Sequence, residues 1–277
     1  MTTFEAPISF TSVYRSARHP RPLTKSHQVV NDVLETGAFA LHVQPIINLR
    51  NGEIRHFEVL LRIVEGGRLA APAAFLQAAE RLGRIQEVDR WVIDHVAELA
   101  AHHSSLTFSV NISGLTIDDG GLAKYIGERL AFHGADPRRI VFELTETAAI
   151  GNIPKAREVI ERVTGFGCEF AIDDFGNGFS TFYYLKNLPS RYVKIDGEFL
   201  SSPESRINEL VIEAIVKIAS DLGKQTIAEY VSDQARMELV VSLGVDFGQG
   251  FHFAEPFPVE LLDGYPRYFR SLARHFG

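Results

Sequence analysis

From about residue 38 the chain alternates short apolar runs with longer stretches in which apolar residues recur at helical spacing. This alternation is typical of a mainly parallel sheet wrapped by helices, because consecutive parallel strands need a long crossover connection. The strand candidates are Ala40–Ile47, His56–Ile63, Thr107–Ile112, Ile140–Leu144, Glu169–Asp173, Tyr192–Ile195, Thr226–Ala228 and Asp246–Phe251. The helical candidates are Ala73–Arg81, Asp89–Ala101, Gly121–His133, Pro154–Gly165, Ile207–Leu222 and Gln234–Leu243. Eight strands suit a closed sheet, so the expected fold class is α/β, a TIM-like (β/α)8 barrel.

The first two strand candidates have no helix between them. The residues Arg50, Asn51, Gly52 and Glu53 that connect them contain an Asn-Gly pair, which is a signal for a tight hairpin turn. The first strand is therefore expected to run antiparallel to the second.

A chain of 277 residues could hold two average domains, but α/β barrels of about 250 residues fold as one. Residues 1–27 differ from the rest, since they contain four Lys or Arg residues and a single acid, Glu5. Their charge of +3 leaves −10 for the remainder of a chain whose net charge is −7. The expected division is a tail over 1–27, flexible or loosely docked, and one barrel domain over 28–277; a partner-binding arm is the alternative for the tail.

Charge and composition exclude several classes of protein. A net charge of −7 gives no reason to expect binding to duplex nucleic acid through its phosphates. No apolar run approaches the roughly 18 residues of a membrane helix, and the first residues do not resemble a secretory signal, so a cytoplasmic location is expected. Cys168 is the only cysteine, which excludes a disulfide framework and predicts a buried packing residue.

Residues able to bind a metal or move a proton stand at the ends of nearly all strand candidates after the first. They are Glu58, Asn111, Glu143, Glu146, Asp173, Asp174, Lys194, Asp196, Glu229 and Gln249. Because the carboxyl ends of the parallel strands in a barrel open on one face, these side chains are expected to converge in one mouth.

Several carboxylates that face one another repel strongly unless cations neutralise them. Carboxylate and amide oxygens favour Mg²⁺ or Mn²⁺ over zinc, and none of the ten histidines has the HExxH spacing of a zinc site. Any one of these acids taken singly could equally cap the helix that follows its strand. The whole set predicts a site for divalent cations.

These residues and their surrounding motifs resemble those of the EAL-domain family of cyclic di-GMP phosphodiesterases, in collinear order over about residues 38–260. The matching motifs are Gln44-Pro45-Ile46, Glu58-Val59-Leu60-Leu61-Arg62, Asn111-Ile112-Ser113, Glu143-Leu144-Thr145-Glu146, Asp173 to Ser180, Leu185 to Pro189, Lys194-Ile195-Asp196, Ala228-Glu229 and Gln249-Gly250-Phe251. The resemblance implies a barrel with one antiparallel strand, two Mg²⁺ or Mn²⁺ ions, and hydrolysis of cyclic di-GMP to linear pGpG.

The resemblance also implies a role for each matching residue. The implied metal ligands are Glu58, Asn111, Glu143, Asp173 and Asp174, with Asp173 shared between the two ions. Glu229 and Lys194 would act on the attacking water. The implied substrate-binding residues are Gln44, Leu60, Arg62, Asp196 and Gln249, with Arg62 meeting a phosphate. Glu146 would fix the loop that begins at Asp173, where the family couples metal binding to dimer contacts.

The sequence departs from the usual family pattern at several positions. Val59 replaces the alanine of the motif that names the family. Asn177, Phe179 and the Thr181-Phe182 pair replace the commoner Thr, Tyr and Ser-Leu of the loop. After Glu229, Tyr230 and Ser232 stand where Gly and a second Glu are more usual. The loss of a carboxylate at Ser232 predicts weaker binding of the second metal.

Two other functions compete with the hydrolase. The first is a catalytically silent receptor that binds cyclic di-GMP and passes the signal to a partner. The second is a metal-assisted enolisation enzyme that uses Lys194 as its base. Retention of all the implied metal ligands favours the hydrolase, and a homodimer and a regulatory protein partner are expected with it.

Overall fold

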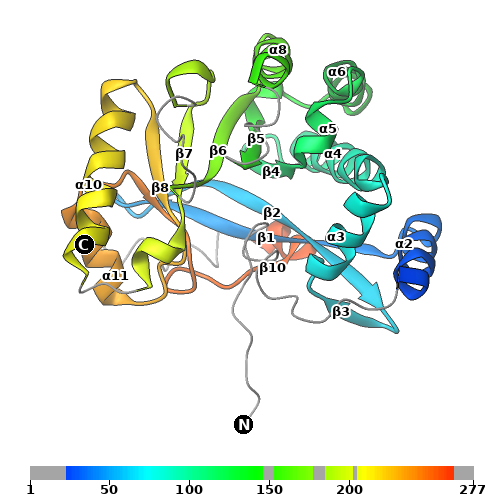
Figure 1. Cartoon of the computed structure of the whole chain (residues 1–277), viewed down its shortest axis with the longest axis horizontal. Coiled ribbons are helices and arrows are strands. Elements are labelled where there is room, and N and C mark those ends of the chain that lie inside the picture. The colour runs from blue at the N-terminus through cyan, green and yellow to red at the C-terminus, as the bar shows by residue number, and fades with distance from the viewer. Residues whose placement is uncertain (1–22, 146–152, 177–184, 202–204, 265–277) are drawn as a thin grey trace.

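The computed structural model describes residues 23–145, 153–176, 185–201 and 205–264 (Figure 1). Its α-helices are α2 (Leu23–Thr36), α3 (Ala73–Arg81), α4 (Ile85–His102), α5 (Gly114–Ile117), α6 (Leu122–His133), α8 (Ile153–Thr164), α10 (Arg206–Asp221) and α11 (Gln234–Ser242). The 3-10 helices are η1 (Pro137–Arg139), η2 (Gly197–Leu200) and η3 (Val259–Gly264). The strands are β1 (Phe39–Asn48), β2 (Ile54–Glu65), β3 (Arg68–Ala70), β4 (Phe108–Ile112), β5 (Ile140–Thr145), β6 (Glu169–Phe175), β7 (Tyr192–Ile195), β8 (Gln225–Ala228), β9 (Phe247–Gly248) and β10 (Phe257–Pro258).

Eight of these strands close into a barrel. The neighbours run β1, β2, β4, β5, β6, β7, β8, β9 and back to β1, with helices packed around the outside (Figure 1). The pairings from β2 round to β9 are parallel, whereas β1 is antiparallel to both β2 and β9. The expected α/β class, the TIM-like barrel and its antiparallel first strand are therefore confirmed.

The hairpin between β1 and β2 is the longest pairing in the barrel. It runs in register from Phe39 opposite Ile63 to Ile46 opposite His56, where a bulge shifts the register. Gly52 has a φ of +71° in the connecting turn, a conformation that glycine adopts without steric cost. The turn expected from Asn51-Gly52 is therefore present.

Several boundaries differ from the sequence-based expectation. The last barrel strand is Phe247–Gly248, not Asp246–Phe251, because from Gln249 onward the backbone pairs with the segment that follows β8 rather than continuing a strand. Helix α4 begins at Ile85, four residues before the expected start at Asp89. The strands β3 and β10 were not expected. Helix α2 begins at Leu23, so the boundary placed after residue 27 falls within a helix.

The barrel interior consists of two layers of different polarity. Alternate residues point inward, so each strand, or the residue that directly follows it, supplies one side chain to each layer. The lower layer is mainly apolar and consists of Ile46, His56, Ser109, Val141, Ala171, Tyr192, Ile227 and Phe247. The upper layer, one step nearer the mouth, is entirely polar and consists of Gln44, Glu58, Asn111, Glu143, Asp173, Lys194, Glu229 and Gln249, all of which are buried. A polar layer of this kind is costly to bury unless its members bind one another or a ligand.

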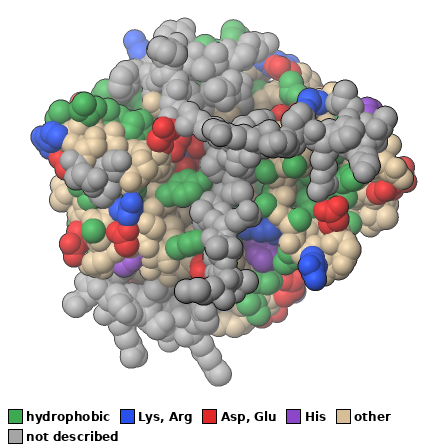
Figure 2. Space-filling model, turned by 60° about the horizontal axis from the view of Figure 1, so that its bottom comes forward, with side chains coloured by type: hydrophobic (Ala, Val, Ile, Leu, Met, Phe, Trp, Pro, Cys, Tyr) green, Lys and Arg blue, Asp and Glu red, His purple; other side chains and the backbone are tan. Residues whose placement is uncertain are grey.

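A second and larger apolar core lies between the outer faces of the strands and the helices. Cys168 is buried in it at 3% exposure, which confirms its expected packing role. On the surface in view in Figure 2, acidic and basic side chains are interspersed with hydrophobic ones. Within the described ranges, no helix combines the length and the hydropathy that crossing a membrane requires.

Asp89 anchors the end of β4 to helix α4. Its buried carboxylate accepts hydrogen bonds from the backbone N–H of Ser113 at 3.0 Å and from the hydroxyl of Thr116. Ser113 in turn caps α5 by accepting from the backbone N–H of Leu115. Burial raises the pKa of Asp89 to about 7, although the hydrogen bonds from Thr116 and Ser113 oppose the shift.

Asp89→Asn should change how stability depends on pH. Between about pH 4, where an unfolded Asp ionises, and about pH 7, folded Asp89 holds a proton that the unfolded chain has released. The stability that this proton confers is fully present below that window and is lost as pH rises through it, with a slope of at most about 1.4 kcal/mol per pH unit. Chemical unfolding from pH 4 to pH 8 should show a steeper decline for the wild type than for Asp89→Asn. The exposed Asp221→Asn is the control, and parallel curves for wild type and Asp89→Asn would contradict the expectation.

Candidate active site

Lys194 lies at the centre of the polar layer, surrounded by carboxylates from four other strands. Its Nζ lies 2.6 Å from Glu143 Oε2, 2.9 Å from Glu229 Oε1, 3.1 Å from Asp173 Oδ1 and 3.4 Å from Glu58 Oε2. The Lys194 side chain is fully buried, so these contacts are not screened by water. Four strand ends that are distant in sequence are thus joined at one ammonium group, which confirms their expected convergence.

Amide side chains hold Glu58 in a fixed orientation. Its Oε1 accepts from Asn111 Nδ2 at 2.8 Å, and its Oε2 accepts from Gln249 Nε2 at 2.6 Å. Gln249 Nε2 also donates to Gln44 Oε1 at 3.1 Å, and Gln44 Nε2 donates to the backbone oxygen of Ala254. In this arrangement Gln249 therefore holds the Glu58 carboxylate directly, and Gln44 holds Gln249.

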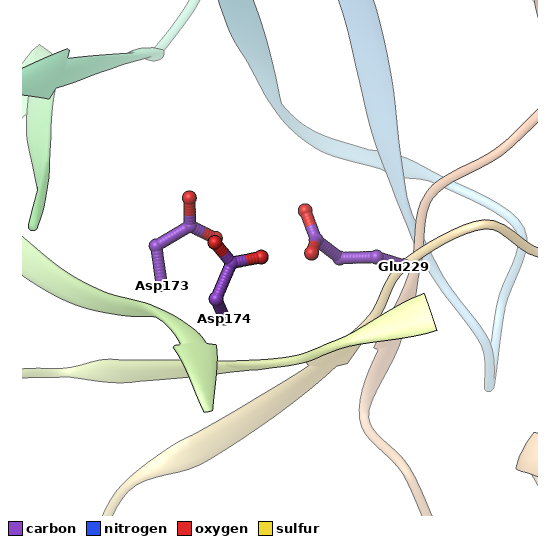
Figure 3. A group of neighbouring side chains, drawn as sticks. All are labelled: Asp173, Asp174 and Glu229. Carbon is purple, nitrogen blue, oxygen red and sulfur yellow. The ribbon is translucent and has the colours of Figure 1, made fainter. Parts of the chain in front are cut away.

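Asp173 and Asp174 both face the mouth, although they are consecutive in β6. In a regular strand their side chains would point to opposite faces of the sheet. Asp174 instead has a φ of +53°, and the pairing of β6 with β7 shifts register between Ile172 and Phe175. Figure 3 shows the two carboxylates side by side, with the carboxylate of Glu229 pointing toward them. One oxygen from each of the three side chains lies within 4.8 Å of the others.

The site carries more negative charge than Lys194 can neutralise. Five buried carboxylates, those of Glu58, Glu143, Asp173, Asp174 and Glu229, share one buried ammonium. Burial raises the pKa of Glu143 to about 8 against the attraction of Lys194, and burial with the neighbouring Asp173 raises that of Asp174 to about 9. Burial also raises the pKa values of Asp173 and Glu229. Without further cations, the site would therefore take up protons near neutral pH.

The pKa of Lys194 is raised as well. Burial by itself would lower it, but the carboxylates of Asp173, Glu143, Glu229 and Glu58 together outweigh burial. The carboxylates around Lys194 therefore favour the charged form of its ammonium group.

The residues present fit divalent metal ions. Buried acceptor atoms of Asn111 (Oδ1), Glu143 (Oε1) and Glu229 (Oε2) have no hydrogen-bond donor among the residues that the structure describes. Such atoms are costly to bury unless a ligand meets them. All are oxygens, and a set of carboxylate and amide oxygens is the donor set that Mg²⁺ and Mn²⁺ favour.

The remaining expected residues lie at the rim. Leu60 and Arg62 follow Glu58 on the inward face of β2 and line a small pocket with Asn111 and Asp89. The half-buried guanidinium of Arg62 donates to the backbone oxygen of Leu61 at 2.9 Å. Burial lowers the pKa of Arg62 from its usual range, and the nearby carboxylate of Glu58 opposes this shift.

Asp196 caps η2 by accepting from the backbone N–H of Glu198 at 2.7 Å. Glu146 and the loop residues Asn177, Phe179, Thr181 and Phe182 lie outside the described residues.

Sequence reasoning missed the part that Asp89 plays in supporting the site. A signal was available, since this acid stands between Val88 and Val92 on the buried face of α4. A carboxylate on an apolar helix face indicates a specific partner, here the end of the strand that carries Asn111.

A sequence model described as the EAL domain matches residues 27–256. The chain belongs to the EAL domain family. The resemblance read from the motifs is therefore confirmed.

Two curated relatives of this EAL domain are the cyclic di-GMP phosphodiesterases PdeB of Shewanella oneidensis and PdeF of Escherichia coli. Each relative is 32% identical to this chain, and the aligned part covers 83% of this chain. The match covers only 28% of PdeB and 31% of PdeF, so the chain spans about a third of the length of these relatives.

Solved structures resemble this EAL domain as well. The PaMucR phosphodiesterase in complex with c-di-GMP matches with a TM-score of 0.81 at 30% identity, over 86% of this chain and 99% of that one. The FimX EAL domain from Pseudomonas aeruginosa bound to c-di-GMP matches with a TM-score of 0.79 at 28% identity, over 83% of this chain and 96% of that one.

Replacing Lys194 with Met should destabilise the metal-free protein. Removing one member of a buried ion pair costs about 3 to 5 kcal/mol, because its partners stay buried without compensation. Chemical unfolding at pH 8 in EDTA should therefore show a clear loss for Lys194→Met. Addition of Mn²⁺ should restore part of the loss, since the cation replaces the missing positive charge.

The control is Lys217→Met, which removes an exposed lysine paired with Asp221 on α10. Its unfolding free energy should stay within about 0.5 kcal/mol of wild type. Equal unfolding free energies for the two variants would contradict the central place given to Lys194.

Proposed function

We propose that this EAL domain is a metal-dependent phosphodiesterase that hydrolyses cyclic di-GMP to linear pGpG with two divalent cations, Mg²⁺ or Mn²⁺. The observation that carries the proposal is the complete set of five buried carboxylates and one amide, gathered around one lysine at the mouth of the barrel. The named activity of the relatives and the ligand in the similar structures support the choice of substrate.

The assignment of metal ligands is the one that the family resemblance implies, and the gathering of these oxygens at the mouth supports it. Glu58, Asn111, Glu143 and Asp173 would hold one ion, and Asp173 with Asp174 would hold the second, where Glu229 also lies. When bound, such a pair of ions lowers the pKa of a water between them and steadies charge on the phosphate oxygens.

The reaction adds water across one phosphodiester bond. The water oxygen forms a bond to phosphorus, the bond from phosphorus to the 3′ oxygen breaks, and the 3′ oxygen gains a proton, which leaves pGpG with a free 5′ phosphate. Glu229 is placed to accept the proton of the water, because its carboxylate lies beside Asp173 and Asp174 and has an oxygen without a donor among the described residues. Lys194 orients the Glu229 carboxylate at 2.9 Å.

Residues at the rim would hold the substrate. Arg62 carries the only positive charge in the described pocket beside Glu58, and a guanidinium matches a phosphate well. Leu60 offers an apolar contact in the same pocket. Gln44, Gln249 and Asp196 would contact the nucleotide or its bound waters. A homodimer, a regulatory protein partner and a cytoplasmic location remain part of the proposal.

The two competing functions require different properties of the residues in the site. An enolisation enzyme would need neutral Lys194 as its base, whereas the four surrounding carboxylates raise the pKa of that lysine. A silent receptor would not need metal ligands, whereas Glu58, Asn111, Glu143, Asp173 and Asp174, the ligands that the resemblance implies, are all present in this chain. The hydrolase is therefore the better account of the site.

Incubation of the purified protein with cyclic di-GMP and Mg²⁺ or Mn²⁺ should release pGpG, and EDTA should stop the release. Chromatography of the nucleotides measures both. Tight binding of an intact nucleotide, with metal present and no product formed, would reject the hydrolase and establish the receptor.

Glu58→Ala should abolish this hydrolysis, because it removes a metal ligand that Asn111 and Gln249 hold in place. Full activity of Glu58→Ala would remove the basis of the metal assignment.

Glu229→Gln should lower kcat by about a hundredfold or more while cyclic di-GMP binding changes little, since loss of a general base affects the chemical step. Single-turnover hydrolysis and equilibrium binding of cyclic di-GMP separate the two effects. Glu238→Gln, on the exposed face of α11, is the matched control and should match wild type. A similar loss in binding and in kcat would argue against Glu229 as the base.

A further inference from the structure

The residue after Glu229 has an unusual backbone conformation. Tyr230 has a φ of +56°, in the left-handed region that side chains other than glycine rarely adopt. The backbone on both sides of it is fixed. The N–H of Glu229 donates to Ile195 at 3.2 Å, and the N–H of Val231 donates to Gln249 at 3.0 Å. Tyr230 is therefore held in a strained conformation between two anchored peptides, directly beside a carboxylate of the site.

The side chain of Tyr230 packs on the backbone of Gly197. A Cβ added at Gly197 would lie 2.1 Å from Tyr230 Cδ2 and 2.6 Å from Tyr230 Cβ, which is closer than atoms can approach. The φ of Gly197 lies outside the left-handed region, so its own backbone would accept a side chain. The near end of the Tyr230 side chain is thus what requires glycine at this position.

Gly197 begins η2, and a second residue of this short helix contacts the residue that follows β6. The ring of Phe199 in η2 lies over Gly176, where an added Cβ would be 2.4 Å from Phe199 Cε2. Gly176 is two residues after Asp174. The helix η2 is therefore wedged between two strand ends, one that carries Asp173 and Asp174 and one that carries Glu229.

We propose that Tyr230 is a positioning residue that, through its contact with Gly197 in η2, sets the separation between the Glu229 carboxylate and those of Asp173 and Asp174. The proposal rests on the metal site of the proposed function and adds to it a side chain to which no metal-binding or substrate-binding role has been assigned. It also gives a reason for a tyrosine at a position where the backbone itself favours glycine. The ring contact compensates the strain and fixes the spacing that two ligand groups need.

The contact is tested by the variants Gly197→Ala, Tyr230→Gly and the two combined, with Mn²⁺ affinity measured by calorimetry. Gly197→Ala should weaken Mn²⁺ binding by about tenfold or more, because the new methyl group pushes the ring and with it Glu229. In the Tyr230→Gly background the same change should have less than about a threefold effect, since the ring that it meets is gone. Gly120→Ala is the matched control, because an added Cβ there would meet only Lys155 Nζ at 3.9 Å.

Tyr230→Phe and Tyr230→Gly separate positioning from general stability. Tyr230→Phe keeps the ring and should keep the Mn²⁺ affinity. Tyr230→Gly should weaken Mn²⁺ binding by about threefold or more even though it relieves backbone strain, and it should lower kcat while KM changes little. A Gly197→Ala effect of equal size in both backgrounds, unchanged Mn²⁺ affinity in Tyr230→Gly, or no Mn²⁺ binding by the wild type would overturn the proposal.

The Mn²⁺ titration needs no turnover, so it distinguishes this proposal from the proposed function. Coupled effects on Mn²⁺ affinity in a protein that does not hydrolyse cyclic di-GMP would support the positioning role and reject the hydrolase. If the protein hydrolyses cyclic di-GMP but the effects of Gly197→Ala and Tyr230→Gly on Mn²⁺ affinity are additive, the hydrolase is supported and the positioning role is rejected.

Discussion

The attraction between one buried ammonium and the carboxylates around it is the interaction on which the polar layer of this barrel depends. Lys194 reaches four carboxylates from four strands, and no water screens these contacts. The layer nevertheless remains deficient in positive charge, since five carboxylates share that lysine. The same imbalance that makes the site costly to fold would favour small, highly charged cations in the proposed metal site. Stability and metal affinity are thus two results of one arrangement of charges.

Much of the architecture could be predicted from the sequence, because the signals involved are local. The apolar runs marked the eight barrel strands, and Asn51-Gly52 marked the hairpin that reverses the first of them. The convergence of Glu58, Glu143 and Glu229 followed from one rule of barrel geometry and needed no knowledge of side-chain conformation. The collinear motifs then supplied the family.

What could not be predicted depends on contacts between distant residues. Alternation along β6 would place Asp173 and Asp174 on opposite faces, and only the backbone conformation at Asp174 brings both to the mouth. The contact between Tyr230 and Gly197 joins residues 33 positions apart and has no signature in either segment. The end of β9 at Gly248 likewise reflects the pairing of Gln249 with the segment after β8.

The reversed first strand determines where the chain enters the barrel. Because β1 runs antiparallel to its neighbours, its first residue, Phe39, pairs with Ile63 near the end of β2, at the mouth. In a barrel whose strands are all parallel, the first strand would begin at the closed floor. Helix α2 is therefore joined to the barrel near the end of β2, and it lies beside α3 (Figure 1). The segment that leads out of that helix therefore lies against the strand that carries Arg62, with Ala40 directly opposite this arginine.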